Sequence, residues 1–266
     1  MNRDFFGKYI LVIPLLIVML FAGKAMAQDE KLFEKNTFFT KQGDTLLYRL
    51  LRPTKSDTTV KYPLVLFLHG AGERGRDNTS QLKSGVLNFA TEQNRKAYPC
   101  YVMAPQCPPG FRWVEVDWKL PSHVQPEQPS VYLARTMLLL DSLVKKLNID
   151  PNRIYIAGLS MGGFGVWDAI SRWPDKFAAA VPVCGGGDTA KAAVIKTIPI
   201  WAFHGDNDKL VMPSRSRDMI AKIKKAGGNP KYTEYPATGH NAWDKAFSEK
   251  EMYQWLFSQT NANRKK

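Results

Sequence analysis

A serine, an aspartate and a histidine occur in this order along the chain, and together these residue types can activate the serine hydroxyl. Ser160 stands at the centre of residues 158–162, which read Gly-Leu-Ser-Met-Gly. A serine hydroxyl is a weak nucleophile at neutral pH, so it needs a base to take its proton and a carboxylate to orient that base. Asp208 and His240 follow it and provide these groups. The pattern predicts attack by Ser160 on a carbonyl carbon.

The segments on either side of Ser160 favour this interpretation over an ordinary serine in a glycine-rich turn. Residues 153–157 have the apolar pattern of a buried strand, and residues 161–173 have the pattern of a helix. A sharp strand–turn–helix connection lifts the serine hydroxyl above the end of the sheet. Gly158 and Gly162 remove side chains that would collide across such a turn.

Two histidines and two aspartates compete for the other two roles. His204 ends the apolar run 198–203, where a histidine usually has a structural role, whereas His240 lies in a loop between the last expected strand and the last expected helix. We therefore expect His240 to be the base. Asp206 and Asp208 both follow the run 198–203; we expect Asp208 to orient the base and Asp206 to bond its own turn.

Attack on a carbonyl also requires donors for the oxygen that becomes negatively charged. The backbone N–H of Met161, directly after the serine, is one expected donor. The second is expected in residues 69–72, which read His-Gly-Ala-Gly after the apolar run 64–68, with the N–H of Ala71 as the donor. Each such donor is worth about 3 kcal/mol in the transition state.

The positions of these residues agree with alternating strands and helices. Strands are expected at 46–51, 64–68, 100–104, 153–157, 178–183, 198–203 and 232–235, and helices at 131–147, 161–173, 214–226 and 242–257. This alternation predicts a three-layer α/β fold with a mostly parallel central sheet, formed by residues 28–266 as a single catalytic domain. Residues 105–130 contain six prolines and little periodicity, so we expect them to form a wall or lid of the site.

The first 27 residues have the layout of a secretory signal peptide. Arg3 and Lys8 precede the apolar stretch 9–22, which is short for a membrane span, and residues 25–27 read Ala-Met-Ala. We therefore expect cleavage after residue 27 and a secreted or periplasmic protein without a stable membrane anchor.

Charge and cysteine content restrict the partners and the redox chemistry. The formal net charge is +13, but the basic residues are spread along the chain, so no nucleic-acid partner is expected. Cys100, Cys107 and Cys184 allow at most one disulfide, and two or three buried free thiols are the alternative. No metal-site spacing occurs, because His123 has no partner at a suitable distance in the sequence. We expect no metal and no organic cofactor.

These motifs together resemble a known group of α/β-hydrolases. Residues 63–75, the serine segment 158–163 and residues 177–186 are similar to those of polyhydroxybutyrate depolymerases, feruloyl esterases and the bacterial "predicted peptidase" esterases. The pattern His-Gly-x-x-Asp at residues 204–208 matches their acid motif and supports Asp208 over Asp206. Gly239 and His240 match the base. The resemblance places Glu73 and Arg74 near the active site, where we expect either a buried ion pair or a substrate contact.

The resemblance implies a secreted serine hydrolase, with a carboxylesterase acting through an acyl-enzyme as the leading expectation. Removal of acetyl or feruloyl groups from polysaccharides is one expected reaction, with an acylated carbohydrate as the ester substrate. Trp113, Trp118 and Trp243 are then candidates for stacking on a sugar or an aromatic acyl group, with ordinary packing as the alternative for each. A serine peptidase of prolyl-oligopeptidase-like type, a lipase and a noncatalytic binding protein on the same scaffold are the competing functions.

Overall fold

The computed structural model describes residues 29–54 and 57–262; the expected signal segment, residues 1–27, lies outside this part. The described residues form one eight-stranded sheet in the order β1-β2-β4-β3-β5-β6-β7-β8. β1 and β2 run antiparallel to their neighbours, and all the other pairs are parallel. The strands are β1 Phe33–Phe39, β2 Thr45–Leu51, β3 Tyr62–Leu68, β4 Tyr101–Pro105, β5 Ile149–Leu159, β6 Ala179–Val183, β7 Trp201–Gly205 and β8 Lys231–Tyr235.

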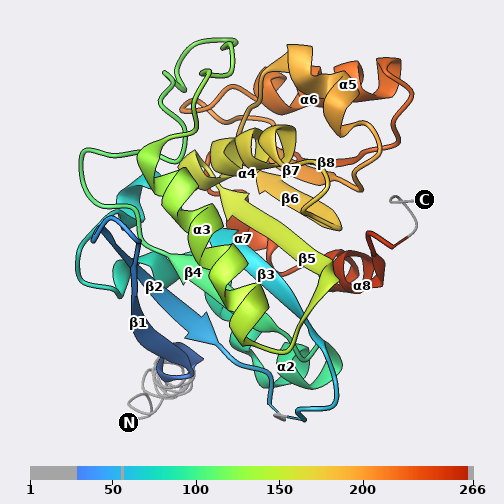
Figure 1. Cartoon of the computed structure of the whole chain (residues 1–266). Coiled ribbons are helices and arrows are strands. Elements are labelled where there is room, and N and C mark those ends of the chain that lie inside the picture. Colours follow the sequence, from blue (N-terminus) through green and yellow to red (C-terminus); the bar gives the residue numbers. More distant parts are fainter. Residues whose placement is uncertain (1–28, 55–56, 263–266) are drawn as a thin grey trace, which may run out of the picture.

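Helices cover both faces of the sheet, as the alternating pattern predicts. They are α2 Glu92–Ala97, α3 Val131–Lys146, α4 Met161–Arg172, α5 Ala192–Ile195, α6 Ser214–Lys225, α7 Trp243–Ala246 and α8 Lys250–Ser258. Figure 1 shows α3 and α4 crossing one face, with α7 visible behind the sheet. The fold is thus the mostly parallel three-layer α/β-hydrolase fold expected from the sequence. No helix of the described part is long and apolar enough to cross a membrane.

The central strand β3 shows why its sequence is continuously apolar. Successive side chains of a strand point to opposite faces, so a strand covered on both sides needs apolar residues at every position. Leu64, Leu66 and Leu68 enter the core under α3, α4 and α6. Val65 and Phe67 enter the second core, under α7 and α8. All five side chains are fully buried, and they fix the register that brings the C-terminal strand ends to one edge.

Several elements differ from the expected ones, among them the short helices α2 and α5, for which the sequence pattern predicts no helix. β1 is an additional edge strand whose side chains are mostly exposed, so it carries little apolar signal. The expected helix 242–257 is two helices, α7 and α8, because the chain leaves the helical path between Phe247 and Glu249. Ser248 completes this break by donating its hydroxyl to the carbonyl of Asp244.

The proline-rich segment between β4 and α3, residues 106–130, contains no helix or strand. Side chains from the helices nevertheless anchor it. Arg215 of α6 donates to the Leu120 carbonyl at 2.8 Å, and Arg172 of α4 donates to the Glu127 carbonyl at 2.9 Å. These contacts tie the segment to two helices, and its role as a wall or lid of the site stays a prediction.

Candidate active site

Ser160 occupies a strained turn between β5 and α4. Its backbone has φ 52° and ψ −119°, a region that residues with a side chain rarely adopt. The turn is also crowded: a Cβ on Gly158 would lie 2.7 Å from the carbonyl oxygen of Gly162, and a Cβ on Gly162 would lie 1.9 Å from that of Leu68. The Ser160 N–H donates to Val183 of β6 at 2.8 Å. Both neighbouring strands therefore hold the serine at the sheet edge.

The structure brings the three expected side chains into one hydrogen-bonded chain. Ser160 Oγ lies 2.8 Å from His240 Nε2, and His240 Nδ1 lies 2.6 Å from Asp208 Oδ2. A carboxylate accepts, so Nδ1 carries a proton and donates to Asp208, which leaves Nε2 free to accept the serine proton. His240 is 16% exposed and Asp208 is completely buried. The His240 side chain can therefore be reached from solvent, whereas the Asp208 side chain cannot.

Asp208 follows β7 in a tight loop that satisfies its carboxylate. Its Oδ1 accepts the N–H groups of Leu210 at 2.9 Å and Val211 at 3.0 Å. Burial alone would raise the pKa of Asp208, but hydrogen bonds from His204, His240 and Val211 hold this pKa below its ordinary value. The acid is thus ionised and oriented. Asp206, by contrast, is exposed and accepts from the N–H of Thr238 in a neighbouring turn.

The loop after β3 is held through its own peptide groups. The His69 ring accepts the Cys107 N–H on Nε2 at 2.9 Å, so Nδ1 carries the proton and donates to the Gly70 carbonyl at 2.7 Å. The His69 carbonyl accepts the indole N–H of Trp113 at 2.9 Å. Burial lowers the pKa of His69 to about 4. A neutral ring with a fixed tautomer therefore orients the peptide whose N–H belongs to Ala71.

Glu73 and Arg74 also hold the loop after β3, through contacts with its backbone that the sequence alone did not indicate. Glu73 is 5% exposed and accepts the Gly70 N–H at 2.6 Å. Arg74 donates through Nε to the Ala71 carbonyl at 2.9 Å. The ion pair that was one expectation for these residues is not formed, because each side chain binds the loop backbone instead. The peptides on either side of Ala71 are fixed as a result.

The two backbone groups expected to stabilise a negative oxygen are both free to donate. Met161 is the first residue of α4, so its N–H has no acceptor within the helix. In the described part of the chain, no hydrogen bond uses the N–H of Ala71. The close approach of Gly162 to the end of β3 brings the serine turn and this loop to the same edge of the sheet. The arrangement fits a pair of donors beside Ser160.

The three tryptophans proposed as substrate contacts have different environments. Trp113 is completely buried against Gly165 and bonds His69, so the structure corrects its expected stacking role to core packing. Trp118 is partly exposed, but Arg112 lies over its ring at 4.5 Å. Trp243 is also partly exposed, and its ring stands edge-on to His240 at 5.2 Å between centroids. Only Trp243 therefore contacts a residue of the hydrogen-bonded chain.

The family model described as phospholipase/carboxylesterase matches residues 54–254 of this chain. The chain belongs to the phospholipase/carboxylesterase family. This membership confirms the α/β-hydrolase resemblance of the sequence motifs, and the match includes Ser160, Asp208 and His240. The description of this family is that of ester-cleaving hydrolases.

Relatives agree with the family. A solved structure described as a thermostable esterase has a TM-score of 0.82 and 40% identity over 88% of this chain and 64% of its own. An uncharacterized secreted protein of Arthroderma benhamiae is 28% identical over 243 residues, 78% of this chain and 25% of its own length. The bifunctional acetylxylan esterase/xylanase XynS20E of Neocallimastix patriciarum is 34% identical over 73 residues, 27% of this chain and 11% of its own. The chain thus spans a quarter or less of these two curated relatives.

Asp208 belongs to a group of three buried side chains whose types can bind metal ions. Atoms of Cys184, His204 and Asp208 lie within 4.8 Å of one another, all buried. The Asp208 oxygens already accept hydrogen bonds, and burial raises the pKa of the Cys184 thiol to about 12. The Asp208 oxygens and both ring nitrogens of His204 have protein hydrogen-bond partners, so the group fits a packed support of Asp208.

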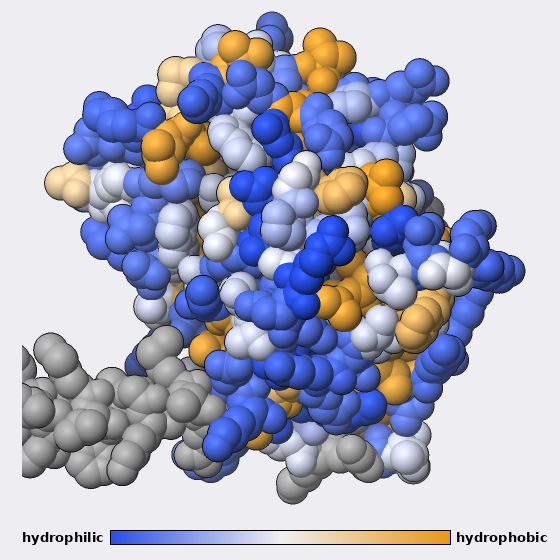
Figure 2. Space-filling model, turned by 90° about the vertical axis from the view of Figure 1, so that its left-hand side faces the viewer, coloured by the Kyte–Doolittle hydropathy of each residue, from blue (hydrophilic) through white to orange (hydrophobic). Residues whose placement is uncertain are grey.

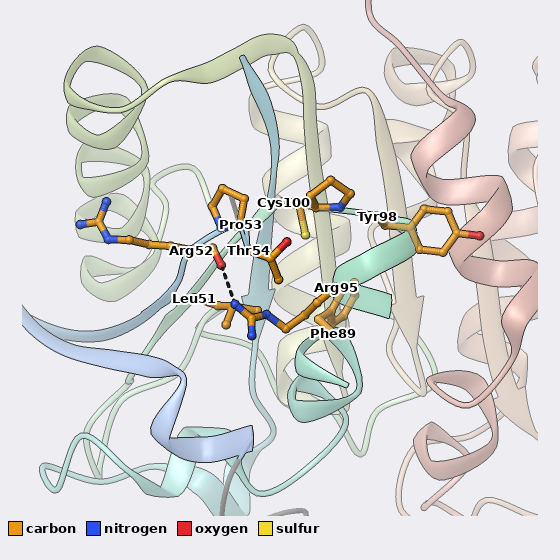
Figure 3. A pocket seen from close by; sticks show the side chains of 9 residues that line it. Leu51, Arg52, Pro53, Thr54, Phe89, Arg95, Tyr98 and Cys100 are labelled. Carbon is orange, nitrogen blue, oxygen red and sulfur yellow. Dashed lines mark hydrogen bonds between the residues drawn. The ribbon is translucent and has the colours of Figure 1, made fainter. Parts of the chain in front are cut away.

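A pocket at the other end of the sheet offers no comparable chemistry. Figure 3 shows it lined by Leu51, Phe89 and Cys100, with the Arg95 guanidinium donating to the carbonyl of Arg52. Cys100 precedes β4, whereas Ser160 follows β5. Because β4 and β5 run in the same direction, the two residues lie at opposite ends of the strands. Burial raises the pKa of Cys100 to about 12. All three cysteines are free and buried, which answers the disulfide question left open by their spacing.

Proposed function

We propose that this chain hydrolyses carboxylic esters with Ser160 as nucleophile, His240 as general base and Asp208 as the orienting acid. The observation that carries the proposal is the continuous chain from Ser160 Oγ to His240 Nε2 and from His240 Nδ1 to Asp208, built on a strained turn. Strain at a single residue persists where the surrounding structure holds it, and it clusters at functional sites. A noncatalytic scaffold would have no need for this turn.

The first half of the reaction follows from the positions of these atoms. Ser160 Oγ attacks the ester carbonyl carbon while its proton moves to His240 Nε2, and Asp208 stabilises the imidazolium through Nδ1. The carbonyl oxygen becomes negatively charged and accepts hydrogen bonds from the N–H groups of Ala71 and Met161. The tetrahedral intermediate then collapses, the alcohol leaves with the proton from His240, and the acyl group remains on Ser160.

The second half repeats these steps with water. His240 takes a proton from a water molecule, which attacks the acyl carbonyl, and the oxygen is again stabilised by Ala71 and Met161. Ser160 leaves as the alcohol and recovers its proton from His240. The carboxylic acid is released, and the complete reaction consumes one ester and one water molecule.

We further propose an acylated carbohydrate as the substrate and an exported enzyme. The carbohydrate ester is supported by the likeness to the acetylxylan esterase/xylanase and by the partly exposed Trp243 beside His240. Export is supported by the pattern of residues 1–27 and by the relative that is named as secreted. On the face drawn in Figure 2, hydrophobic residues occur as small separate groups, unlike the broad apolar surface that a lipase presents.

A substrate panel tests this proposal. Wild type and Ser160→Ala are compared on p-nitrophenyl acetate, acetylated and feruloylated xylan oligosaccharides and peptide anilides. We expect turnover of the esters, preference for an oligosaccharide ester, and a loss of at least about 1,000-fold in kcat for Ser160→Ala. Cleavage of peptide anilides without ester turnover would replace the esterase by a peptidase, and equal rates in both variants would refute the role of Ser160.

A further inference from the structure

A second histidine lies directly behind the acid of the proposed site. His204 is the penultimate residue of β7 and is completely buried. Its Nε2 lies 3.2 Å from Asp208 Oδ2, the same oxygen that His240 contacts from the other side, and 3.0 Å from the carbonyl oxygen of Val211. From the sequence alone we expect only a structural role for this histidine at the strand end, and its contact with Asp208 becomes visible in the folded structure.

The neighbours of His204 decide where its protons lie. The Val211 carbonyl can only accept, so Nε2 carries a proton and directs it between that carbonyl and Asp208. On the other side of the ring, Nδ1 lies 2.7 Å from the hydroxyl of Ser216 on α6, which in turn lies 3.1 Å from the Gly185 carbonyl. Both ring nitrogens are therefore engaged, and the orientation of the imidazole is fixed from β7, α6 and the loop after β6.

The hydrogen bonds of Asp208 show what this ring contributes. Oδ1 accepts two backbone N–H groups from its own loop, whereas Oδ2 accepts only from side chains, His240 and His204. His240 must move protons during turnover and is partly exposed. His204 does neither. It is thus the constant donor that keeps Oδ2 in line with His240 Nδ1 while the base changes its charge.

We propose that His204 is a positioning residue for the reaction: through its Nε2–H it holds the Asp208 carboxylate in the orientation that fixes the tautomer of His240. The inference rests on the proposed roles of Ser160, Asp208 and His240. It goes beyond them because it assigns a function to a buried side chain that does not touch the substrate. It also explains why a polar ring occupies a fully buried strand position beside the buried thiol of Cys184.

A double-mutant cycle between His204 and Asp208 tests the proposal on the full chain with p-nitrophenyl acetate. We expect His204→Leu to lower kcat about tenfold with little change in KM, since one charge-assisted hydrogen bond to the acid is lost. In the Asp208→Asn background, the same change should lower kcat less than about twofold, because its route of action is already removed. The folded fraction is measured by near-ultraviolet circular dichroism in every variant, so that kcat refers to folded protein.

The conservative variant separates positioning from packing. Gln places an amide N–H near the position of Nε2, so His204→Gln should retain kcat within about threefold, whereas an apolar side chain of similar size cannot. If His204→Leu fails to fold, His204→Met fills the same space with a more adaptable side chain and takes its place in the cycle. Losses that multiply fully in the Asp208→Asn background, or a Gln variant as damaged as the apolar one, would overturn the proposal.

The cycle also distinguishes this inference from the proposed function. If Asp208→Asn alone leaves turnover unchanged, the proposed triad is wrong and the inference falls with it. If Asp208→Asn lowers turnover strongly and His204→Leu acts independently of it, the triad stands and only the positioning role of His204 is refuted.

Discussion

The carbonyl oxygen of Leu68 lies so close to Gly162 that a Cβ on that glycine would be 1.9 Å from it. This approach joins the end of β3 to the first turn of α4. The loop that carries Ala71 follows Leu68 directly, and Ser160 precedes Gly162 by two residues. The contact between Leu68 and Gly162 therefore sets the distance between Ser160 and the proposed donor N–H of Ala71.

Gly162→Ala is expected to separate these elements. The overlapping atoms are backbone atoms and cannot move aside as a flexible side chain can, so α4 must shift away from β3. We predict a loss of about 3 kcal/mol in the free energy of unfolding, measured in urea, and a fall in kcat of at least 100-fold, since small misplacements of reacting groups have large effects. Gly72→Ala is the folding control, because a Cβ there meets no atom within 4 Å. Equal stability of the two variants would refute this packing argument.

Glu73 should contribute to kcat through the N–H of Gly70. Gln offers a carbonyl oxygen of similar reach, so Glu73→Gln is expected to keep kcat within about threefold, whereas Glu73→Leu leaves that N–H without its acceptor at 2.6 Å. We predict a fall of about tenfold in kcat for the Leu variant with an unchanged KM, measured on p-nitrophenyl acetate. A matching rise in KM would instead place Glu73 in contact with the substrate, and equal kcat values for Gln and Leu would show that the hydrogen bond has no role.

His69 makes the stability of the protein depend on pH in a defined window. Burial lowers the pKa of His69 to about 4 from its ordinary 6.5. Between these values the unfolded chain binds a proton that the native ring does not, so stability falls as pH decreases from 6.5 to 4, by on the order of 3 kcal/mol in total. Urea unfolding at several pH values should give a shallower slope for His69→Asn. An unchanged slope would mean that the native ring is protonated in this range.

Arg215 should hold the proline-rich segment in place. Its guanidinium is buried, donates to the Leu120 carbonyl and contacts the His123 ring. We predict that Arg215→Met lowers the free energy of unfolding by about 2 kcal/mol and opens residues 106–130 to limited proteolysis. Arg217→Met is the matched control on the same helix, because Arg217 is about half exposed and pairs with Glu234 on the surface. Equal protease sensitivity of both variants would show that Arg215 does not anchor the segment.

Local patterns in the sequence predicted the framework well because the elements that carry the site are short and strongly apolar. Ser160 between a buried strand and a helix, and His240 in a late loop, are visible along the chain. The edge strand β1 was missed because most of its side chains are exposed. For Trp113 the sequence leaves stacking on a substrate and ordinary packing as alternatives, because its contacts with His69 and Gly165 come from distant segments.

The same limit applies to the support of the site. The hydrogen bonds from Glu73 and Arg74 to the loop backbone, and from His204 to Asp208, depend on side-chain directions at the ends of the strands. The only signals in the sequence are a polar ring at the end of an apolar run and two charged residues after a glycine-containing loop. Neither pattern specifies which atom each side chain contacts.

Labelling with a fluorophosphonate probe, followed by mapping of the modified peptide, tests the central claim most directly. The probe reacts with a serine that is activated by a neighbouring base. The structure predicts one phosphonylated residue, Ser160, with labelling abolished in Ser160→Ala and slowed in His240→Gln, each variant being folded by circular dichroism. Folded wild-type protein that hydrolyses esters while Ser160 stays unmodified would contradict the account.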